Sequence, residues 1–482
     1  MGLFFGGKME IKNFDGRRVG WTDVPLDLYT PVSAFLTLKN HGAVFLLESV
    51  EKGEKLGRFS FIGLDPEERI IIDHGILRSP GRETSINRAN IKEVLDSLMQ
   101  ERYGADKEEI VFAGGWVGYV GYEFARFLDE IELKKEDSLF PLLYLFKVKK
   151  LLIFDHVKHT GKILVSGNGP SEREIKEYLT TIKNVLTDQP VFNMQEKSSL
   201  GQAEVKLSAS LSESEYIRIV NQTKEYIKAG DIFQAVLAIK FEGRSSASPF
   251  DIYRALRILN PSPYMFYFDF GDFQVIGSSP ESHLKVDGGT VSIRPIAGTR
   301  GRGKTREEDL ELEKQLINDQ KERAEHVMLI DLARNDLGKI CRLGTVQITE
   351  KMSVERYSHV MHLVSRVEGK LNQNVTFFDL LQATFPAGTV TGAPKIRAME
   401  IIDFLEPVSR GPYAGVVGYF GFNGNVDLCI GIRMIIYRQG IFYLQGGAGI
   451  VIGSKPESEY LEVQNKIKGM REAINIAERG GF

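Results

Sequence analysis

The chain contains very little cysteine: only Cys341 and Cys429 occur in 482 residues. Two isolated cysteines give neither a disulfide framework nor the ligand spacing of a zinc site, which fits a reducing cytoplasm. The chain also lacks an apolar run of the roughly 18 to 20 residues that a membrane-spanning helix needs, and the short run at residues 3–5 is flanked by glycines. We therefore expect a cytoplasmic protein without a secretion signal or a membrane partner.

An excess of charge of one sign is also missing. The chain has 61 Lys and Arg against 64 Asp and Glu, a net charge of −3, and such a weak field does not by itself attract nucleic acid or a membrane surface. The sequence contains no Walker phosphate loop, no dinucleotide-binding GxGxxG after a strand, and no Ser/His/Asp or Cys/His nucleophile motif. We therefore expect partners among small molecules and other proteins, and no nucleic acid.

A polar stretch at residues 193–212 divides the chain, because aromatic and β-branched residues become rare there while Ser, Gln, Lys and Glu accumulate. We interpret it as a linker between an N-terminal region, residues 1–192, and a C-terminal region, residues 213–482. Strand-like runs occupy residues 69–72, 114–122, 151–154, 232–241, 413–422, 428–437 and 441–444.

Helix signals are sharpest in the C-terminal region. Ser212 and Glu215 form a capping-box pair that predicts a helix through Ala229, which Gly230 ends. A long helical pattern runs over residues 306–337, and a final helix is expected at residues 456–477, which begins with proline. Strands and helices do not alternate regularly, so the pattern favours a large α+β fold over a doubly wound sheet.

Two pairs of glutamates stand at helical spacing far apart in the chain. Glu322 and Glu325 share a face of the long helix, and Glu459 and Glu462 repeat the spacing on the final helix. If the two faces meet, four carboxylates converge and require a cation, and their hard oxygen atoms would select Mg²⁺. Spacing alone, however, favours the alternative that both pairs are solvated surface charges, since this spacing is common on helices.

Three glycine-rich segments, residues 296–300, 385–395 and 445–449, offer backbone N–H groups that a ligand can approach closely. Lys395 adds a cation, and Arg433, on an expected strand, is suited to clamp a carboxylate. Each segment alone is more often only a turn, but together they predict a multiply anionic small molecule. His359 and His362, each taken alone, are more often ordinary half-buried histidines.

Five long motifs in this sequence resemble the signatures of the chorismate-utilising enzymes, in the order that the family has them. They are IRPIAGTRGRG, LIDLARNDLG, VMHLVS, FPAGTVTGAPK and PESEYLEVQNK. The resemblance covers nearly the whole chain. It implies a large α+β fold, a two-sheet sandwich with helices on the outside and an active site in a cleft between the sheets.

The resemblance also implies roles for individual residues. Glu325 and Glu462 are expected to bind Mg²⁺ directly, with Glu322 and Glu459 close by. The residues expected to hold chorismate are Gly298, Thr299, Thr389, Tyr413, Arg433, Gly447, Ala448, Gly449 and Lys466.

A few positions distinguish the reactions of this family. Where Gln234 stands, members that hydroxylate chorismate have a lysine that activates water, so glutamine favours amination. Where Ala297 stands, members that make 4-amino-4-deoxychorismate have a nucleophilic lysine, so alanine favours direct attack of ammonia on carbon 2 and formation of anthranilate and pyruvate in tryptophan biosynthesis. Glu281 is the expected general acid for the hydroxyl that leaves carbon 4, and His362 matches the histidine linked to the later elimination.

Two alternatives stay open at this point. One is 4-amino-4-deoxychorismate synthesis for the folate pathway, against which Ala297 argues. The other is a catalytically inactive relative that senses tryptophan, against which the complete set of four glutamates, His362 and Arg433 argues, because a sensor needs no metal site.

The resemblance extends to regulation by tryptophan. Residues 46–49, LLES, resemble the family's tryptophan-binding motif, and residues 260–266, NPSPYMF, resemble its complement. Without the resemblance these would be a plain strand end and a proline turn. Glu48 and Ser49 are expected to hold the amino group of the inhibitor, and Tyr264 and Met265 to form a wall against its indole ring. The implied inhibitor site comprises Glu48, Ser49, Pro263, Tyr264 and Met265.

The source of ammonia predicts a protein partner. The chain has no second region with a Cys/His amidotransferase signature, and free ammonia is scarce at neutral pH because most of it is protonated. We therefore expect a separate glutamine amidotransferase subunit (component II) that supplies ammonia, in a heterotetramer of two large and two small subunits.

Overall fold

The structure is a computed structural model. It describes residues 9–14, 17–26, 28–50, 57–102, 110–136, 139–167, 170–187, 204–356 and 360–480, with only the backbone of Thr299 and Lys321. Most of the predicted linker, residues 193–203, therefore lies outside the described residues, as does His359.

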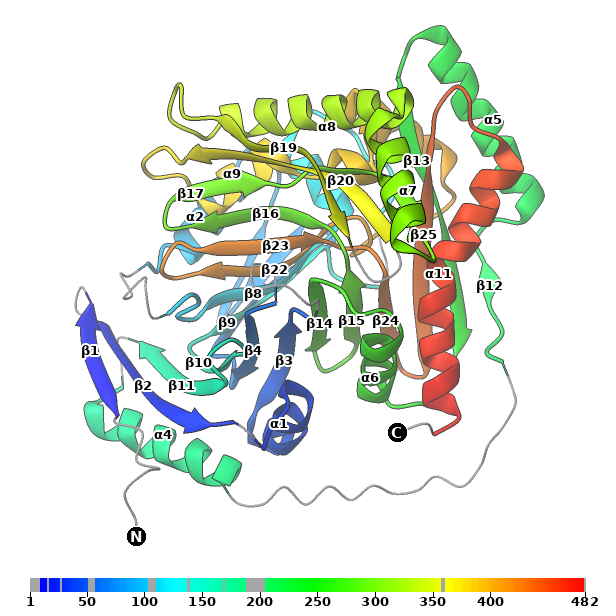
Figure 1. Cartoon of the computed structure of the whole chain (residues 1–482). Helices are drawn as coiled ribbons and strands as arrows, with labels where there is room; N and C mark the ends of the chain where they lie inside the picture. The colour runs from blue at the N-terminus through cyan, green and yellow to red at the C-terminus, as the bar shows by residue number, and fades with distance from the viewer. Residues whose placement is uncertain are drawn as a thin grey trace.

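Two large antiparallel sheets dominate the described part of the chain (Figure 1). The first has 13 strands among the described residues. From edge to edge they are β1 (Glu10–Phe14), β2 (Arg17–Pro25), β11 (Thr160–Gly167), β10 (Lys150–Asp155), β4 (Phe59–Leu64), β3 (Ala43–Glu48), β14 (Tyr264–Asp269), β15 (Gln274–Ser279), β24 (Met434–Arg438), β25 (Ile441–Ile450), β13 (Gln234–Arg244) and β12 (Ser208–Ala209), with β21 (Gly392–Ala393) beside β13.

The second sheet has 12 strands among the described residues. They are β18 (Ile296–Gly301), β20 (Val360–Lys370), β17 (Thr290–Ile293), β16 (Ser282–Asp287), β23 (Val426–Ile430), β22 (Val416–Gly421), β8 (Gly115–Val120), β9 (Leu143–Val148), β5 (Glu68–Asp73), β6 (Ile76–Ser79) and β7 (Arg82–Ser85), with β19 (Gln347–Arg356) beside β20.

Both sheets are built jointly by the N-terminal and C-terminal regions. In the first sheet the regions meet where β3 pairs with β14, with Glu48 opposite Met265. In the second they meet where β22 pairs with β8, with Gly418 opposite Gly118. Gly118 explains the small residues of the predicted strand at residues 114–122, since a Cβ there would lie 2.0 Å from Tyr144 O of β9. The two regions therefore share one pair of sheets.

Aromatic side chains fill the space between the sheets. Phe61 of β4 and Tyr419 of β22 meet edge to face with their ring centroids 5.8 Å apart, and Phe112 stacks on Tyr419 at 4.2 Å. These residues belong to one continuous core that includes strands of both sheets. The predicted α+β class with two packed sheets is confirmed.

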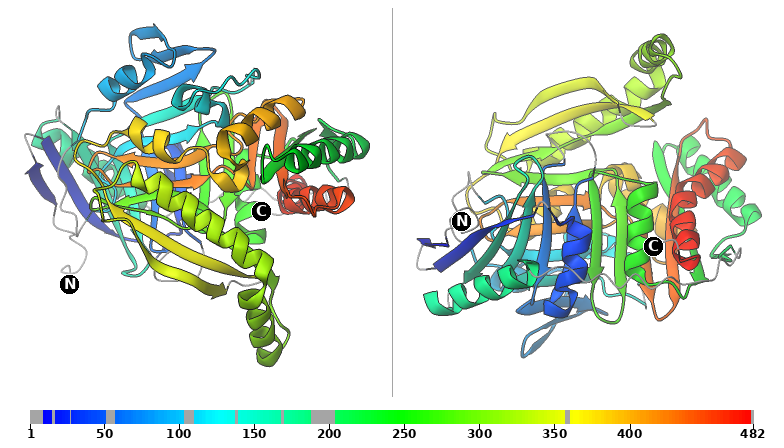
Figure 2. Two further views of the ribbon diagram at one scale, coloured as in Figure 1. Left: turned by 90° about the horizontal axis from the view of Figure 1, so that it is seen from above. Right: turned by 60° about the horizontal axis from the view of Figure 1, so that its bottom comes forward.

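Helices cover the outside of the sheets, as Figures 1 and 2 show. A second core lies between the first sheet and the helices on its outer face. The helices are α1 (Pro31–Leu38), α2 (Ile91–Leu98), α3 (Ala125–Leu128), α4 (Glu172–Thr187), α5 (Glu213–Ala229), α6 (Pro249–Leu259), α7 (Arg306–Asn318), α8 (Gln320–Gly338), α9 (Phe377–Thr384), α10 (Lys395–Leu405) and α11 (Pro456–Glu478), with short 3-10 turns η1 (Lys39–His41), η2 (Tyr122–Phe124) and η3 (Gly388–Val390). Within the described residues, no helix is long and apolar enough to span a bilayer.

Local sequence signals placed several elements correctly. Ser212 and Glu215 form the predicted capping box of α5, and Gly230 ends that helix in the left-handed conformation at φ +83°. The final helix α11 begins at the predicted proline, Pro456. These signals are local hydrogen-bonding preferences, which tertiary packing did not need to override.

Two predicted elements were wrong because each is divided into two in the structure. The helix expected over residues 306–337 is two helices, since Asp319 leaves the helical conformation and its carboxylate accepts the N–H of Glu322, capping α8. The strand expected over residues 428–437 is also two: β23 lies in the second sheet and β24 in the first. Arg433 stands at this crossing in the left-handed conformation at φ +51°, and not on a strand.

Candidate active site

A stretch of exposed glycine backbone on β25 forms one wall of the candidate site. A Cβ on Gly447 would lie 3.0 Å from the hydroxyl of Tyr413, and a Cβ on Gly449 would lie 2.8 Å from Nε2 of Gln234 on β13. Ala448, between them, is fully buried in the core beneath the outer helices, so its methyl group points to the opposite face of the sheet. Four predicted residues from three separate segments therefore meet here, and two of them, Gly447 and Gly449, expose the backbone of β25.

Two cations border this glycine strand. Lys466 of α11 donates from Nζ to Gly447 O at 2.8 Å and forms an ion pair with Glu462 at 2.6 Å. Arg433 donates from its guanidinium to Lys466 O at 3.2 Å, and burial lowers the pKa of Arg433 from its ordinary value. Two cations beside an unobstructed backbone are suited to bind carboxylates.

Glu281 lies between β15 and β16, and Thr389 of η3 donates from its hydroxyl to Glu281 Oε1 at 2.7 Å. Burial raises the pKa of Glu281 to about 7, although the Thr389 hydrogen bond and the cations Lys466 and Arg433 act in the opposite direction. A carboxyl group with this pKa is partly protonated at neutral pH, so it is able to act as a general acid.

The second side of the site is formed by α8, β18 and β20. A Cβ on Gly298 would lie 3.2 Å from Oε2 of Glu322, and Arg300 lies 3.6 Å from that carboxylate. His362 lies opposite Thr299 in the β18–β20 ladder, and its Nδ1 is 3.2 Å from Gly298 O. A carbonyl only accepts, so Nδ1 carries a proton; burial lowers the pKa of His362, which favours the neutral ring with Nε2 as its basic nitrogen.

A small cavity of about 50 Å³ lies between Glu281 and α8. Its walls include Glu281 and Thr389 together with Leu329 and Leu332 of α8. Glu325 precedes Leu329 by four residues and is half-buried on the same helix face. The carboxylate-bearing face of α8 is therefore turned toward the general-acid candidate.

The structure does not gather the four predicted metal ligands at one point. Within the described residues, no group of three or more His, Cys, Asp or Glu side chains is close enough together to hold a metal. Glu322 lies beside Arg300, and Glu462, with its side chain 48% exposed, is paired with Lys466; Glu325 and Glu459 are half-buried. The donor set consists of carboxylate oxygens, which fits Mg²⁺, whose shell water and a substrate carboxylate commonly complete.

Lys395, expected to face an anionic ligand, is occupied elsewhere. Its ammonium lies 3.5 Å from Oδ2 of the buried Asp336 and donates to Thr384 O at 3.2 Å. Burial lowers the pKa of Lys395. These contacts hold the start of α10 against α8 and α9 rather than presenting a free cation to the site.

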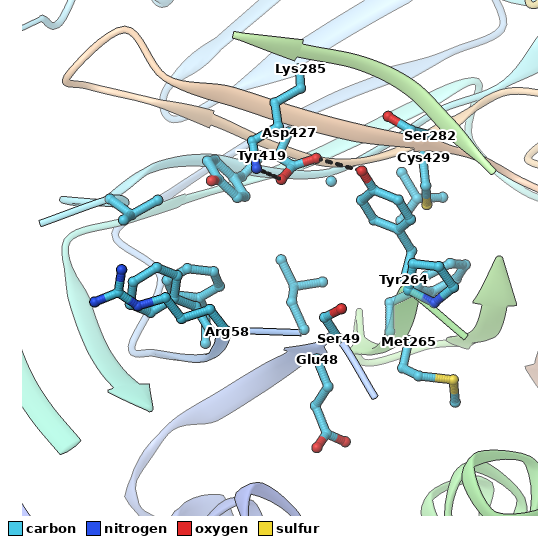
Figure 3. Close-up of a pocket in the computed structure, with 18 of the residues that line it drawn as sticks. Glu48, Ser49, Arg58, Tyr264, Met265, Ser282, Lys285, Tyr419, Asp427 and Cys429 are labelled. Atoms are coloured by element: carbon cyan, nitrogen blue, oxygen red, sulfur yellow. Dashed lines mark hydrogen bonds and ion pairs between the residues drawn. The ribbon is translucent and has the colours of Figure 1, made fainter. Parts of the chain in front are cut away.

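A larger cavity, of about 310 Å³, lies between the sheets (Figure 3). It is lined by all five residues of the predicted inhibitor site: Glu48, Ser49, Pro263, Tyr264 and Met265. Their positions follow from the pairing of β3 with β14.

Two of these five side chains turn away from the cavity, as Figure 3 shows for Glu48 and Met265. The carboxylate of Glu48 accepts hydrogen bonds from Tyr253 and from Arg257, the latter at 3.0 and 3.1 Å. Met265 is 1% exposed. Glu48 therefore anchors the end of β3 to α6, and its backbone, rather than its carboxylate, borders the cavity.

Sequence reasoning missed six charged residues of this cavity: Arg58, Lys285, Asp287, Arg294, Arg366 and Asp427. The Tyr264 hydroxyl donates to Asp427 Oδ1 at 3.0 Å, and Lys285 lies 3.4 Å from the same carboxylate. The residues come from separate parts of the chain, so no spacing in the sequence signalled them.

Comparisons with known proteins agree with this arrangement. Residues 42–472 match the family described as chorismate binding enzyme. Anthranilate synthase component 1 of Acetivibrio thermocellus is 42% identical over 473 residues, 94% of each chain. The Aquifex aeolicus protein of the same name is 43% identical over 484 residues, 95% of this chain and 94% of the relative.

Solved structures match the fold of this chain over nearly its full length. The crystal structure of anthranilate synthase component I from Streptococcus pneumoniae superposes with a TM-score of 0.78 at 36% identity, covering 92% of this chain and 98% of that one. The menaquinone-specific isochorismate synthase from Escherichia coli shares the fold, with a TM-score of 0.71 at 19% identity over 96% of both chains. The chain therefore belongs to the family of chorismate-binding enzymes, as its motifs predicted, and its relatives are anthranilate synthase component 1 proteins.

Proposed function

We propose that this chain is the chorismate-converting component of an anthranilate synthase, which forms anthranilate and pyruvate from chorismate and ammonia in tryptophan biosynthesis. The observation that carries the proposal is Glu281, which accepts a hydrogen bond from Thr389 and has a pKa of about 7, suited to a general acid. It lies beside the cations Lys466 and Arg433 and the open backbone of β25. The name of the relatives, which the chain matches over nearly its full length, supports the same activity.

Binding is assigned to the glycine strand and its neighbours. Arg433 and Lys466 neutralise the carboxylates of chorismate, while Gly447 and Gly449 let the ligand approach the backbone, with Tyr413 alongside. The 50 Å³ cavity beside Glu281 has room for only a few water-sized molecules, so most of chorismate lies over β25.

Amination then proceeds by general acid catalysis. Ammonia attacks carbon 2 while the hydroxyl leaves carbon 4, and Glu281 protonates this hydroxyl so that it departs as water. Gln234 offers no base to activate a competing water molecule, and Ala297 offers no amine for a covalent intermediate. The product of this half is an aminated ring that still carries the enolpyruvyl group.

Elimination completes the reaction on the α8 side of the site. His362, with Nε2 as its basic nitrogen, takes the proton from carbon 2, and the enolpyruvyl group leaves as pyruvate after protonation of its methylene carbon. Aromatisation of the ring makes this half favourable.

Mg²⁺ is the implied cofactor. Glu325 and Glu462 would hold it, with Glu322 and Glu459 nearby; when bound it supplies positive charge that neutralises and orients the ring carboxylate. Because these glutamates stand on two helices, α8 and α11 would each contribute carboxylate ligands to the bound metal.

The partner and the inhibitor follow from the same assignment. The relatives are named component 1, which implies a second component, and we propose a glutamine amidotransferase that supplies ammonia in a heterotetramer of two large and two small subunits in the cytoplasm. Tryptophan is proposed to bind in the 310 Å³ cavity that Ser49, Pro263 and Tyr264 line. This cavity is separate from the β25 wall, so the inhibition is allosteric.

One incubation tests the activity. The full chain is mixed with chorismate, Mg²⁺ and an ammonium salt, and anthranilate is followed by its fluorescence, with a parallel sample containing a chelator. Anthranilate and pyruvate in equal amounts are expected, and the chelator should stop their formation. Accumulation of 4-amino-4-deoxychorismate, or no conversion although tryptophan binds, would contradict the proposal.

A further inference from the structure

Arg410 is a fully charged side chain in the protein interior, only 2% exposed. It follows α10 and stands three residues before Tyr413. Its Nε donates to Glu406 Oε2 at 2.9 Å, and its two terminal nitrogens donate to Val390 O at 2.7 Å and to Val236 O at 2.6 Å. The planar guanidinium therefore uses its fork of donors to join three segments at once.

Two of these partners lie close in sequence to a residue of the candidate active site. Val390 directly follows Thr389, and Val236 stands two residues after Gln234 on β13. Glu406, which balances the charge of Arg410, also accepts the N–H of Ala238 on β13 at 2.8 Å. The ion pair thus fastens η3 to β13, directly beneath the residues that face the ligand.

The backbone N–H and carbonyl of Arg410 also form hydrogen bonds. Its N–H donates to Glu123 Oε1 at 2.7 Å, and its carbonyl accepts from Gln445 Nε2 of β25 at 3.0 Å. The guanidinium also lies 4.6 Å from the ring centroid of Tyr122. Arg410 therefore links η3, β13 and β25 to the N-terminal half of the molecule.

Stability alone does not require a charge here. A buried ion pair has a large desolvation cost, and apolar side chains of similar volume commonly stabilise a protein equally well. What an apolar side chain does not supply is a set of directed hydrogen bonds to two carbonyls on different segments. Lysine does not supply it either, since its three donors share one nitrogen atom.

We infer that Arg410, balanced by Glu406, is a positioning residue that holds Thr389 against Glu281. This inference rests on the proposed function, because it assigns Glu281 a catalytic task. If η3 loses its hold on Arg410, the Thr389 hydroxyl moves away from the carboxyl group. Glu281 then loses the hydrogen bond that opposes the effect of burial, so its protonated form persists to higher pH.

The test uses Arg410→Lys in the full chain, with chorismate, Mg²⁺ and excess ammonium. We expect kcat to fall about tenfold to hundredfold, as displacements of about 1 Å in catalytic groups produce. The KM for chorismate should change less than about threefold, because Arg433 and Lys466 remain in place. The alkaline limb of the pH profile should move upward by about one unit, the scale of one lost hydrogen bond to a charged group.

Two further variants make the result decisive. Glu406→Gln preserves the side-chain shape while removing the counter-charge, and it should shift the alkaline limb in the same direction; it serves if the lysine variant does not fold. Lys147→Gln is the matched control, since it breaks two half-buried ion pairs elsewhere, with Glu68 and Glu101, and should lower the melting temperature without moving the pH profile. A folded Arg410 or Glu406 variant with the wild-type pH profile overturns the inference, whereas a wild-type chain that forms no anthranilate overturns the proposed function instead.

Discussion

The larger cavity, of about 310 Å³, lies between the faces of two sheets, and charged groups at its rim, such as Lys285 and Asp427, are already paired. The smaller cavity, of about 50 Å³, lies between Glu281 and α8, and the Glu462–Lys466 pair of α11 lies outside its lining. A site on paired strands is complete before its ligand arrives, whereas a site divided between helices is completed by the ligand. We expect this difference between the proposed inhibitor site and the proposed metal-assisted catalytic site.

The two cavities share part of their walls. Ser282 and Arg294 line both, and Pro280 and Glu281 line the larger and the smaller cavity in turn. We therefore propose that an occupant of the larger cavity shifts this shared segment, which carries the proposed general acid Glu281. Coupling of this kind requires only that the two ligands favour different positions of that one segment.

The largest effect is expected from removal of the general acid. Glu281→Gln keeps the side-chain size but does not transfer a proton, so kcat should fall by about 10²- to 10⁴-fold while tryptophan still binds. Anthranilate fluorescence measures the first effect and calorimetric titration with tryptophan the second. Glu457→Gln, at an exposed position of α11, is the control and should leave both unchanged. Loss of tryptophan binding in the Glu281 variant would show that the two cavities are not separate sites.

His362→Met examines the α8 side alone. The variant should still aminate chorismate, because Glu281 and Thr389 are untouched, but it lacks the base for elimination, so anthranilate formation should fall about 100-fold. Chromatography of the reaction mixture should then reveal the aminated intermediate. Undiminished anthranilate output would remove His362 from the mechanism.

How far the sequence predicts this arrangement depends on the distance over which each signal acts. Ser212, Gly230 and Pro456 act on their own neighbours, and the helix ends they predicted are correct. The break at Asp319 was missed because an acidic residue within a helical pattern looks the same whether it continues the helix or caps the next one. The crossing of the chain between the sheets at Arg433 was missed because both flanking strands are apolar.

The residues of the candidate sites were also predictable to different extents. Motifs pointed to Gln234, Gly449 and Lys466, which the structure brings together through the pairing of β13 with β25 and the packing of α11 on β25. The true partners of Glu48, which are Tyr253 and Arg257, could not be predicted, since they lie on α6 about 200 residues away and face the strand only after folding.

Ser49→Phe changes the larger cavity alone. A phenylalanine ring there occupies space that the inhibitor needs, and overpacking of about 1 to 3 kcal/mol corresponds to roughly tenfold to hundredfold weaker inhibition by tryptophan. Chorismate turnover without inhibitor should stay within about twofold of wild type. Ser49→Ala is the matched control and should remain inhibited. Full inhibition of the phenylalanine variant would move the inhibitor site elsewhere.

The pH dependence of the reaction rate tests the smaller cavity in the wild-type chain, without mutation. Glu281 must be protonated to act, and its pKa is about 7, so the rate per concentration of unprotonated ammonia should fall about tenfold per unit as the pH rises above this value. Well below that pH Glu281 is almost fully protonated, so its titration should not raise the corrected rate further. Steady-state rates across the range, corrected for ammonia protonation, measure this limb. An alkaline limb far above the pKa would point to another acid.

The smallest effect is expected at the anchor of the inhibitor site. Tyr253→Phe removes one hydrogen bond to the buried carboxylate of Glu48 but leaves its ion pair with Arg257. The free energy of unfolding should therefore fall by about 2 kcal/mol. Because Glu48 borders the cavity only with its backbone, inhibition by tryptophan should weaken less than tenfold, and chorismate turnover should not change. Thermal unfolding and inhibition curves measure both, with Tyr267→Phe in the same core as the control that spares the bonds to Glu48. If the Tyr253 variant instead loses inhibition altogether, the carboxylate of Glu48 turns into the cavity when tryptophan binds, and the inhibitor site is completed by its ligand.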